Sequence, residues 1–421
     1  MKRVPGPKLI VFILFIVLYA VGASVAGCQK APTATPTPTK TPTEVPPLAT
    51  ATPMPTATLT PTKTPTPTAT ASVESALAAT ATPEPTQAIT PTPVLVEMAA
   101  DINPLTGLKT DPAKLNRRPL AIKIPNAPAA ARPQSGLSLA DVVLEYEAEA
   151  NLTRFTAIFL GEDATLLGPV RSMRIPDSEV VPIFKAALVA SGGHPAVKMR
   201  MTEGKSWADG YKRIICPEDP FLGDGGALKR ISGKKPLFEL TMYSDTSSLW
   251  NVLAQRGVNE QQDFDHMFVF SQEPPAGGSE ATRLKIVYKP TFAELEYQYD
   301  AETKTYKRTD MGQPLIDELV DEQIAPENVV VLFVNHVDTD IAADKHDPKH
   351  IWYAISIQLW GQGPAKIFRD GKVYDATWIR ENPQQENDRL IFIDGNGNQV
   401  PFRPGQTWIQ LVRLDGRVII E

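Results

Sequence analysis

The chain has 421 residues, of which 48 are acidic and 42 are basic, and 42% of its residues are hydrophobic. Its net charge of −6 is that of a poor nucleic-acid binder, so we expect no nucleic-acid partner. The length leaves room for more than one domain.

Residues 1–27 have the layout of a secretory signal. Three basic residues stand near the start, and the stretch from residue 9 to residue 27 carries no charge. Because that stretch is long enough to span a bilayer, an uncleaved transmembrane anchor is the alternative. The stretch runs into the sequence VAGC, which resembles a bacterial lipobox and implies that Cys28 is lipidated and becomes the mature N-terminus. Both interpretations place the rest of the chain outside the cytoplasm, at the cell membrane.

Loss of the signal would make the protein more acidic. It would leave 39 basic and 48 acidic residues, a net charge of −9. Such a protein gains nothing from an anionic membrane surface, so we expect the lipid to be its membrane attachment. Cys216 would be the one remaining thiol, which excludes an internal disulfide. It follows two isoleucines, a setting typical of a buried and unreactive cysteine.

Residues 28–100 form a predicted disordered tether. Between residues 31 and 94, 36 of 64 residues are proline or threonine, and none is aromatic. Such a segment cannot bury enough apolar surface to offset its chain entropy. Its prolines favour polyproline II, with a reach on the order of 200 Å when extended and roughly 50 Å as a coil. We predict a spacer that lifts a globular head off the membrane, towards cell-wall polymer as a potential partner.

A composition break at residues 271–282 (SQEPPAGGSEAT) predicts two domains, at residues 101–275 and 280–421. The first is predicted to mix helices and strands. Its strands are expected at residues 120–124, 142–147 and 153–160, the last two joined as a hairpin by residues 149–151. Its helices are expected from Asp177 or Ser178 to Gly192-Gly193, and from a Thr246 or Ser247 cap to Gly257.

The second domain is predicted to be mostly β-structure. Four strands are expected in RLKIVYK, FAELEYQYD, NVVVLFV and YAISIQLW. Asp370-Gly371 and Asp415-Gly416 each predict a hairpin turn, and IFIDGNGNQVPF predicts a looser one. The fold class is therefore α+β, with a mixed α/β N-terminal domain followed by a mainly antiparallel β C-terminal domain.

Several motifs then occur in a recognisable order. They are NPLTGL, RPQSGLSLADVVLEYEAE, TRF and GPVRSMR in the first domain, and YKRTDMGQPLID, FRDGKVYDATW and PGQTWIQLV in the second. Together they resemble the YerB-like bacterial lipoproteins, a two-domain family of unknown function, from Asn103 to Val412. The resemblance implies an envelope lipoprotein and carries over no catalytic residue. In that family a histidine often precedes the Gly-Gly pair, where this chain has Ser191.

The candidate ligand-binding residues gather around the predicted hairpin of the first domain. Strand alternation places Glu145 and Glu147 on one face, with Cβ atoms about 6.5 to 7 Å apart. Arginine side chains hold carboxylates and phosphates in two-point contacts. We predict a pocket for an anionic or sugar-like ligand, such as an envelope polymer, formed by Arg132, Asp141, Glu145, Glu147, Arg154, Arg171 and Arg174. The alternative is an ion-pair network that only fixes the hairpin.

A hydrolase acting on cell-envelope polymer is the second functional hypothesis, with Glu145, Arg154 and Arg171 as its centre. The spacing of Glu145 and Glu147 is near that of a glycosidase pair, but such carboxylates must face each other across the substrate. Side chains two positions apart on a strand point in parallel instead. Ser135 lacks the G-x-S-x-G elbow. The catalytic residues and the ligand therefore stay open, and no cofactor is predicted.

One cluster has the composition of a metal site but the wrong spacing. The sequence HVDTDIAADKHDPKH, residues 336–350, holds three histidines and four aspartates. His346 and His350 would share a helix face, but Pro348 between them breaks such a helix. The aspartates do not follow the EF-hand pattern. We therefore predict a solvated loop and no metal.

Overall fold

The computed structural model describes residues 98–202, 211–218, 221–289, 293–344, 351–385 and 388–421. They belong to one compact unit, which spans residues 84–421. The predicted signal, Cys28 and the predicted tether lie outside the described residues. Among the described residues, no helix is long and apolar enough to cross a membrane.

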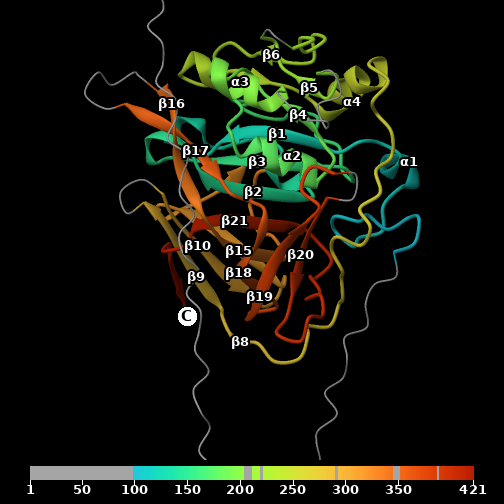
Figure 1. Cartoon of the computed structure of the whole chain (residues 1–421), viewed down its shortest axis with the longest axis vertical. Helices are drawn as coiled ribbons and strands as arrows, with labels where there is room; N and C mark the ends of the chain where they lie inside the picture. The colour runs from blue at the N-terminus through green and yellow to red at the C-terminus, as the bar shows by residue number, and fades with distance from the viewer. Residues whose placement is uncertain (1–97, 203–210, 219–220, 290–292, 345–350, 386–387) are drawn as a thin grey trace, which may run out of the picture. The chain divides into compact units, whose positions relative to one another are not determined.

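An 11-stranded mixed sheet runs through both halves of the chain (Figure 1). Its order is β20-β19-β18-β15-β21-β2-β3-β1-β4-β5, with β8 paired to β19. The first half supplies β1 (Leu120–Pro125), β2 (Val142–Glu147), β3 (Thr153–Phe159), β4 (Ala187–Val189) and β5 (Ile214–Ile215). The second supplies β8 (Ser279–Glu280), β15 (Asn328–Val334), β18 (Gly361–Arg369), β19 (Lys372–Glu381), β20 (Arg389–Ile393) and β21 (Thr407–Arg413). The halves join where β2 pairs with β21 in parallel.

From β15 to β5 in the sheet order, six of the seven strands run in the same direction. The pairs β15–β21, β21–β2, β1–β4 and β4–β5 are parallel, and β3 runs antiparallel between β2 and β1. Their carboxyl ends therefore meet along one border, which we call the carboxyl edge. In mixed sheets of this kind, ligands usually bind beside such an edge.

The two faces of the sheet contact different layers. Leu144 and Tyr146 of β2 belong to one apolar core, and Val143 belongs to the other, as strand alternation requires. On the first side, the α2 face, lie α2 (Asp177–Ile183) and α3 (Pro195–Thr202). On the second side, the β9 face, lie α4 (Thr246–Gln255) and a second sheet.

The second sheet has five strands in the order β12-β11-β10-β9-β22. These are β9 (Arg283–Lys289), β10 (Ala293–Asp300), β11 (Thr305–Asp310), β12 (Gln313–Pro314) and β22 (Arg417–Ile420). Leu284, Ile286 and Tyr297 pack in the same core as Trp408 of β21. The second half of the chain therefore builds one sheet and completes the other.

Short elements complete the described fold. Three two-stranded sheets pair β6 (Lys229–Arg230) with β7 (Met242–Tyr243), β13 (Ile316–Asp317) with β14 (Glu322–Gln323), and β16 (His336–Asp344) with β17 (Trp352–Ile357). The short helices are α1 (Pro112–Leu115), η1 (Ala129–Ala131), η2 (Leu137–Leu139), η3 (Glu149–Asn151) and η5 (Phe238–Leu240). The hairpin β16–β17 contacts η3, and in Figure 1 it rises beside the ends of β1–β3.

Much of the predicted pattern is confirmed. The fold class is α+β, with a mixed sheet and helices in the first half and mainly antiparallel strands in the second. The β2–β3 hairpin turns through η3, and Asp370 and Gly371 have φ of 51° and 72° at the β18–β19 turn. Cys216 is buried, and burial raises the pKa of its thiol to about 11.

The helix predicted from residue 177 to Gly192-Gly193 is wrong in its second half. α2 ends at Ile183, after one proline at position 182, and Lys185 has a φ of 47°. Proline has no N–H to continue the helix, and a positive φ stops it. The next residues form β4, a fully buried strand beside β1. The cap of α4 is also shifted: Asp245 accepts the hydrogen bond from the Ser248 amide.

Two further predictions in the second half are wrong. Asp415-Gly416 does not close a hairpin, because β21 belongs to the large sheet and β22 to the five-stranded one. Residues 336–344 form strand β16 and not a loop, because they pair with β17, with irregular register between Asp338 and Asp344. Residues 345–350 lie outside the described residues.

Candidate functional site

The seven predicted site residues do not form one site, because they lie on different faces and borders of the large sheet. Tyr146 of β2 stands opposite Arg154 of β3, and Glu145 stands opposite Phe155. Directly opposite residues share a face, so Arg154 lies on the α2 face and Glu145 lies on the β9 face. The sheet therefore stands between the two groups that the hydrolase hypothesis would place in one centre.

Glu145 belongs to a buried network between the two sheets. Its carboxylate lies 2.7 Å from Arg308 of β11, and neither side chain is exposed. Thr153 donates to the same carboxylate at 2.7 Å, and the Arg308 guanidinium donates to the Tyr297 hydroxyl at 2.8 Å. Burial alone would lower the pKa of Arg308, but Glu145, Tyr297 and Asp310 together raise it. This ion pair therefore connects the halves of the chain.

Arg132 extends the same network. It lies 2.8 Å from Asp310 and donates to the Asn126 side-chain oxygen at 3.0 Å. The Asn126 amide in turn donates to Asp310 at 2.7 Å and to Glu145 at 3.1 Å. Because each of these charged groups has an opposite charge beside it, the network has the character of a support between the sheets.

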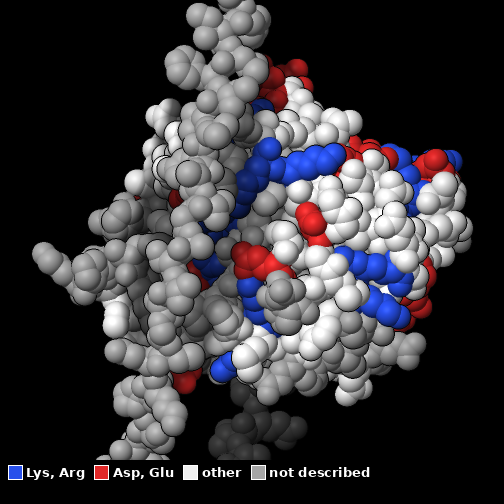
Figure 2. All heavy atoms as spheres, turned by 90° about the horizontal axis from the view of Figure 1, so that it is seen from above, with Lys and Arg blue, Asp and Glu red and all other residues white. Residues whose placement is uncertain are grey.

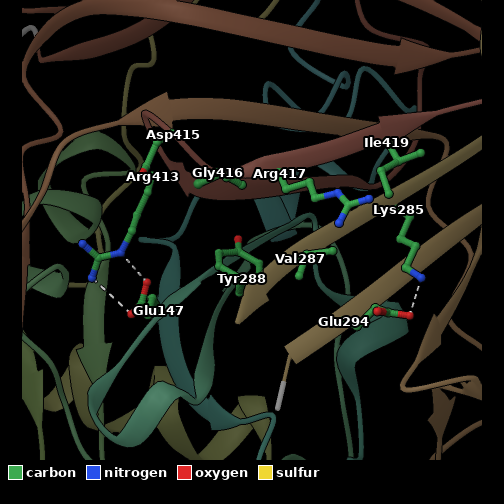
Figure 3. Close-up of a pocket in the computed structure, with 11 residues that line it drawn as sticks. Glu147, Lys285, Val287, Tyr288, Glu294, Arg413, Asp415, Gly416, Arg417 and Ile419 are labelled. Atoms are coloured by element: carbon green, nitrogen blue, oxygen red, sulfur yellow. Dashed lines mark hydrogen bonds and ion pairs between the residues drawn. The ribbon is translucent and has the colours of Figure 1, made fainter. Parts of the chain in front are cut away.

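Glu147 lies at one end of a separate groove (Figure 3). The groove has a volume of about 390 Å³ and is lined by β9, β10, β22 and the ends of β2 and β21. Arg413 holds Glu147 with contacts of 2.7 and 3.1 Å, and Lys285 holds Glu294 at 2.5 Å. The figure shows these two pairs at opposite ends of the groove, so the protein itself already neutralises both carboxylates.

Asp141 lies at the opposite border of the sheet, just before β2 begins. It accepts hydrogen bonds from the Asn103 side chain and the Leu160 amide, both at 2.5 Å, and from the Gly161 amide at 3.2 Å. Burial raises the pKa of Asp141 to about 6 in spite of these donors. The residue fastens the segment that enters the head to the end of β3.

The remaining three predicted residues, Arg154, Arg171 and Arg174, do come together, at the carboxyl edge of the sheet. We call them the arginine cluster. Arg154 is 5% exposed, and it donates to the carbonyl oxygens of Ala127 at 3.2 Å and Thr153 at 3.0 Å. Its Nε–H has no hydrogen-bond partner, and no carboxylate of the described residues lies within 4 Å of it.

The three side chains lie near enough for their charges to act on one another. Burial first, and then the charges of Arg174 and Arg171, lower the pKa of the Arg154 guanidinium to about 9. That value is still above neutrality, so Arg154 keeps its charge at pH 7. Burial and Arg174 also lower the pKa of Arg171. Like charges held together at such a cost are typical of a site that awaits an anion.

The backbone fixes Arg171 between β1 and the loop after β4. The Arg171 amide donates to the Lys123 carbonyl at 2.8 Å, and its carbonyl accepts from the Ser191 amide at 3.0 Å. The Arg171 guanidinium donates to the backbone oxygen of Glu239 at 3.2 Å. Arg174 differs from the other two, since its Nε lies 2.5 Å from Glu149.

A buried group of polar side chains, centred on Lys123 and Asp177, contacts the cluster through Arg174. Lys123 of β1 lies 2.8 Å from Asp177 of α2, both fully buried, and it also bonds to Tyr146 and Thr156. Burial lowers the pKa of Lys123 to about 8, against the opposing effect of Asp177. Asp177 also accepts from the Arg174 amide at 2.6 Å, so this group sets the position of Arg174.

The sequence analysis missed several of these partners. Lys123 had a visible signal, a single charge within the otherwise apolar strand LAIKIP. Glu149 follows Glu147 at the same spacing by which Glu147 follows Glu145. Arg308 and Arg413 had no such signal, because only the tertiary pairing of the two halves brings them to Glu145 and Glu147.

One face of the molecule carries both kinds of charge. Figure 2 shows Lys and Arg side chains gathered near the middle of one face, with acidic side chains beside them. In the described part of the chain, no group of three or more His, Cys, Asp or Glu side chains could hold a metal ion. The chemistry that the arginine cluster suits is the binding of an anion by charge-assisted hydrogen bonds.

Comparisons with known proteins agree with this architecture. Residues 105–259 match the model "Protein of unknown function (DUF3048) N-terminal domain", and residues 284–409 match its C-terminal domain. The chain is 30% identical over 312 residues to "Putative lipoprotein YerB" of Bacillus subtilis (strain 168), covering 73% of this chain and 85% of that protein.

A solved structure is also similar to this chain. The crystal structure of YerB protein from Bacillus subtilis matches with a TM-score of 0.60 and 27% sequence identity, covering 76% of this chain and 99% of that one. The family resemblance predicted from the motifs is confirmed. The chain, which matches both DUF3048 domain models, belongs to the YerB-like family.

Proposed function

We propose that this protein is a lipid-anchored lipoprotein of the cell envelope whose head binds an anionic envelope ligand at the arginine cluster. One observation carries the ligand part of the proposal. Arg154 is a buried cation without a carboxylate partner among the described residues, and it lies beside two further arginines. A scaffold would gain stability by pairing such a charge, as it does for Arg308.

The position of the cluster supports the same proposal. The arginines lie at the carboxyl edge beside the end of β1, and Arg171 and Arg174 are partly exposed, so a ligand can reach them. The Glu145–Arg308 network offers no such access, because both side chains are fully buried. The separation of Glu145 from Arg154 by the sheet removes the support for the hydrolase hypothesis.

The anchor part of the proposal rests on the sequence and the relative. The lipobox resemblance places the lipid on Cys28, and the Bacillus subtilis relative is named as a lipoprotein. A tether with a reach of roughly 50 to 200 Å would then hold the head outside the cytoplasm, within range of wall polymer.

Binding to insoluble envelope polymer tests the proposal. The full-length chain in detergent would be sedimented with purified polymer before and after chemical removal of its anionic groups. We expect binding to the intact polymer alone, and a loss of binding at high salt because exposed charges are screened. Arg171→Gln should bind less, since it removes a cluster charge that has no ion-pair partner among the described residues.

Arg417→Gln is the matched control. Arg417 is an exposed arginine on β22 that lines the groove of Figure 3 and is remote in sequence from the cluster. It removes the same charge from another surface, so its binding should equal that of the wild type. Equal binding of wild type and Arg171→Gln, or loss in Arg417→Gln alone, would contradict the assignment of the ligand to the arginine cluster.

A further inference from the structure

The charges around the arginine cluster do not cancel. Asp177 compensates Lys123 at 2.8 Å, and Glu149 compensates Arg174 at 2.5 Å. Arg154 and Arg171 have no carboxylate within 4 Å in the part of the chain that the structure describes. Two positive charges are therefore left over at the carboxyl edge of the sheet.

The neighbouring charged and titratable groups do not cancel this excess positive charge. Arg230 and Glu239 act on Arg171 with opposite signs, and the Arg230 guanidinium lies 3.8 Å over the Phe238 ring. Tyr146 stays neutral, because burial and Asp177 raise its pKa well above the ordinary value. His194, on the loop after β4, is the remaining titratable neighbour in that loop.

We infer that the group bound at the cluster is a dianion, a phosphate monoester on the ligand. This inference rests on the proposed function and narrows its ligand class. One doubly charged group cancels both uncompensated arginines. A carboxylate or a phosphodiester, with one charge, would leave a cation uncompensated beside Arg154, which is 5% exposed.

The donors also suit the shape of a phosphate. A phosphate monoester offers three terminal oxygens as acceptors, and arginines bind such oxygens through two parallel N–H groups. The Arg154 Nε–H is a buried donor that still lacks an acceptor. The loop after β4 is held by two backbone hydrogen bonds, between Ser191 and Arg171 and between Gly192 and Met173. Helix α3 begins at Pro195, directly after this loop, and the partial positive charge of its N-terminus adds to the positive potential there.

The charge requirement makes binding depend on pH in a known direction. A phosphate monoester gains its second charge with a pKa of about 6. At pH 5 only about one tenth of it is dianionic, so its apparent affinity should be about tenfold lower than at pH 7.5. Sulfate is a dianion throughout this range.

Calorimetric titration of the full-length chain in detergent tests the inference. The probes are methyl phosphate, dimethyl phosphate, acetate and sulfate, each at pH 7.5 and pH 5. At pH 7.5 we expect methyl phosphate to bind at least about tenfold more tightly than dimethyl phosphate or acetate. At pH 5 methyl phosphate should lose about tenfold in affinity while sulfate loses none.

Variants separate this inference from the proposed function. Arg171→Gln removes one of the two uncompensated charges and should abolish the preference for methyl phosphate over dimethyl phosphate, whereas Arg417→Gln should keep it. Equal affinities for all four probes would keep an anion site and overturn the dianion. No binding of any probe by a folded wild-type chain would overturn both. A fall in sulfate affinity at pH 5 that equals the fall for methyl phosphate would also overturn the inference.

Discussion

Two buried arginines of this protein, Arg308 and Arg154, differ in the charges that surround them. Arg308 has Glu145 at 2.7 Å and lies 4.9 Å from the Trp408 ring. Arg154 has two arginine neighbours and no carboxylate within 4 Å among the described residues. The difference is not visible in the sequence, because the tertiary pairing of the two halves decides which charges lie beside each arginine. It separates a residue that holds the fold from one that is available for a ligand.

Arg308→Met should destabilise the protein strongly. It leaves Glu145 buried without its counter-charge, which typically costs about 3 to 5 kcal/mol. Urea unfolding of the variant and wild type measures the difference. Lys366→Ala is the control, since its pair with Asp375 is exposed on one side and should contribute at most about 1 kcal/mol. A loss below about 1 kcal/mol for Arg308→Met would show that the pair does not support the fold.

Asp141 should make stability depend on pH between about 4 and 6. Its pKa is raised to about 6 in the folded protein, so the folded state binds the proton more tightly than the unfolded state. The stabilising effect is therefore complete below about pH 4 and is lost as the pH rises through 6, by up to about 3 kcal/mol. Unfolding free energies of wild type and Asp141→Asn across this range measure it. Identical pH profiles would contradict the assignment.

At the scale of the elements, strands were easier to predict than their partners. Alternation in VVLEYE correctly assigned Leu144 and Tyr146 to one face and Glu145 to the other. The segment AALVA reads equally well as helix or strand, and only its burial beside β1 makes it β4. The Asp415-Gly416 turn failed for a related reason, since a short-range signal does not say to which sheet the next strand belongs.

The β18–β19 turn provides a test at this scale. Gly371 has a φ of 72°, and an added Cβ would stand 2.9 Å from the Tyr299 ring of the second sheet. Gly371→Ala should therefore cost more than the roughly 1 kcal/mol expected for a positive φ alone. Gly312→Ala is the matched control, with a φ of 75° and no atom within 4 Å of the added Cβ. Equal unfolding free energies for the two variants would show that the contact with Tyr299 does not constrain the turn.

At the scale of the whole molecule, composition predicted the anchor, the tether and a head made of two sequence halves. It could not predict that β2 and β21 would pair and continue one sheet through both halves. For the same reason it placed seven charged residues in one site, of which three come together. Of the other four, Asp141 lies at the opposite sheet border, and Glu145 and Arg132 belong to the network between the sheets. Glu147 lines the groove.

Cys28→Ala should release the protein from the membrane or leave it misplaced. Lipidation needs the cysteine sulfur, which alanine lacks, and the acidic head has no attraction of its own for an anionic membrane surface. Membrane fractionation and mass spectrometry of the N-terminal peptide would detect the change. An unmodified Cys28 in a membrane-bound chain that keeps residues 1–27 would establish the transmembrane alternative.

The central claim is that the arginine cluster is a binding site and not part of the scaffold. The most direct test is the melting temperature of full-length wild type and Arg154→Met, each with and without saturating sulfate. We predict that wild type is stabilised by sulfate through mass action, and that Arg154→Met melts no lower than wild type without sulfate and gains little from it. A strong loss of stability in Arg154→Met, together with no response of wild type to sulfate, would contradict the claim and leave Arg154 as scaffold.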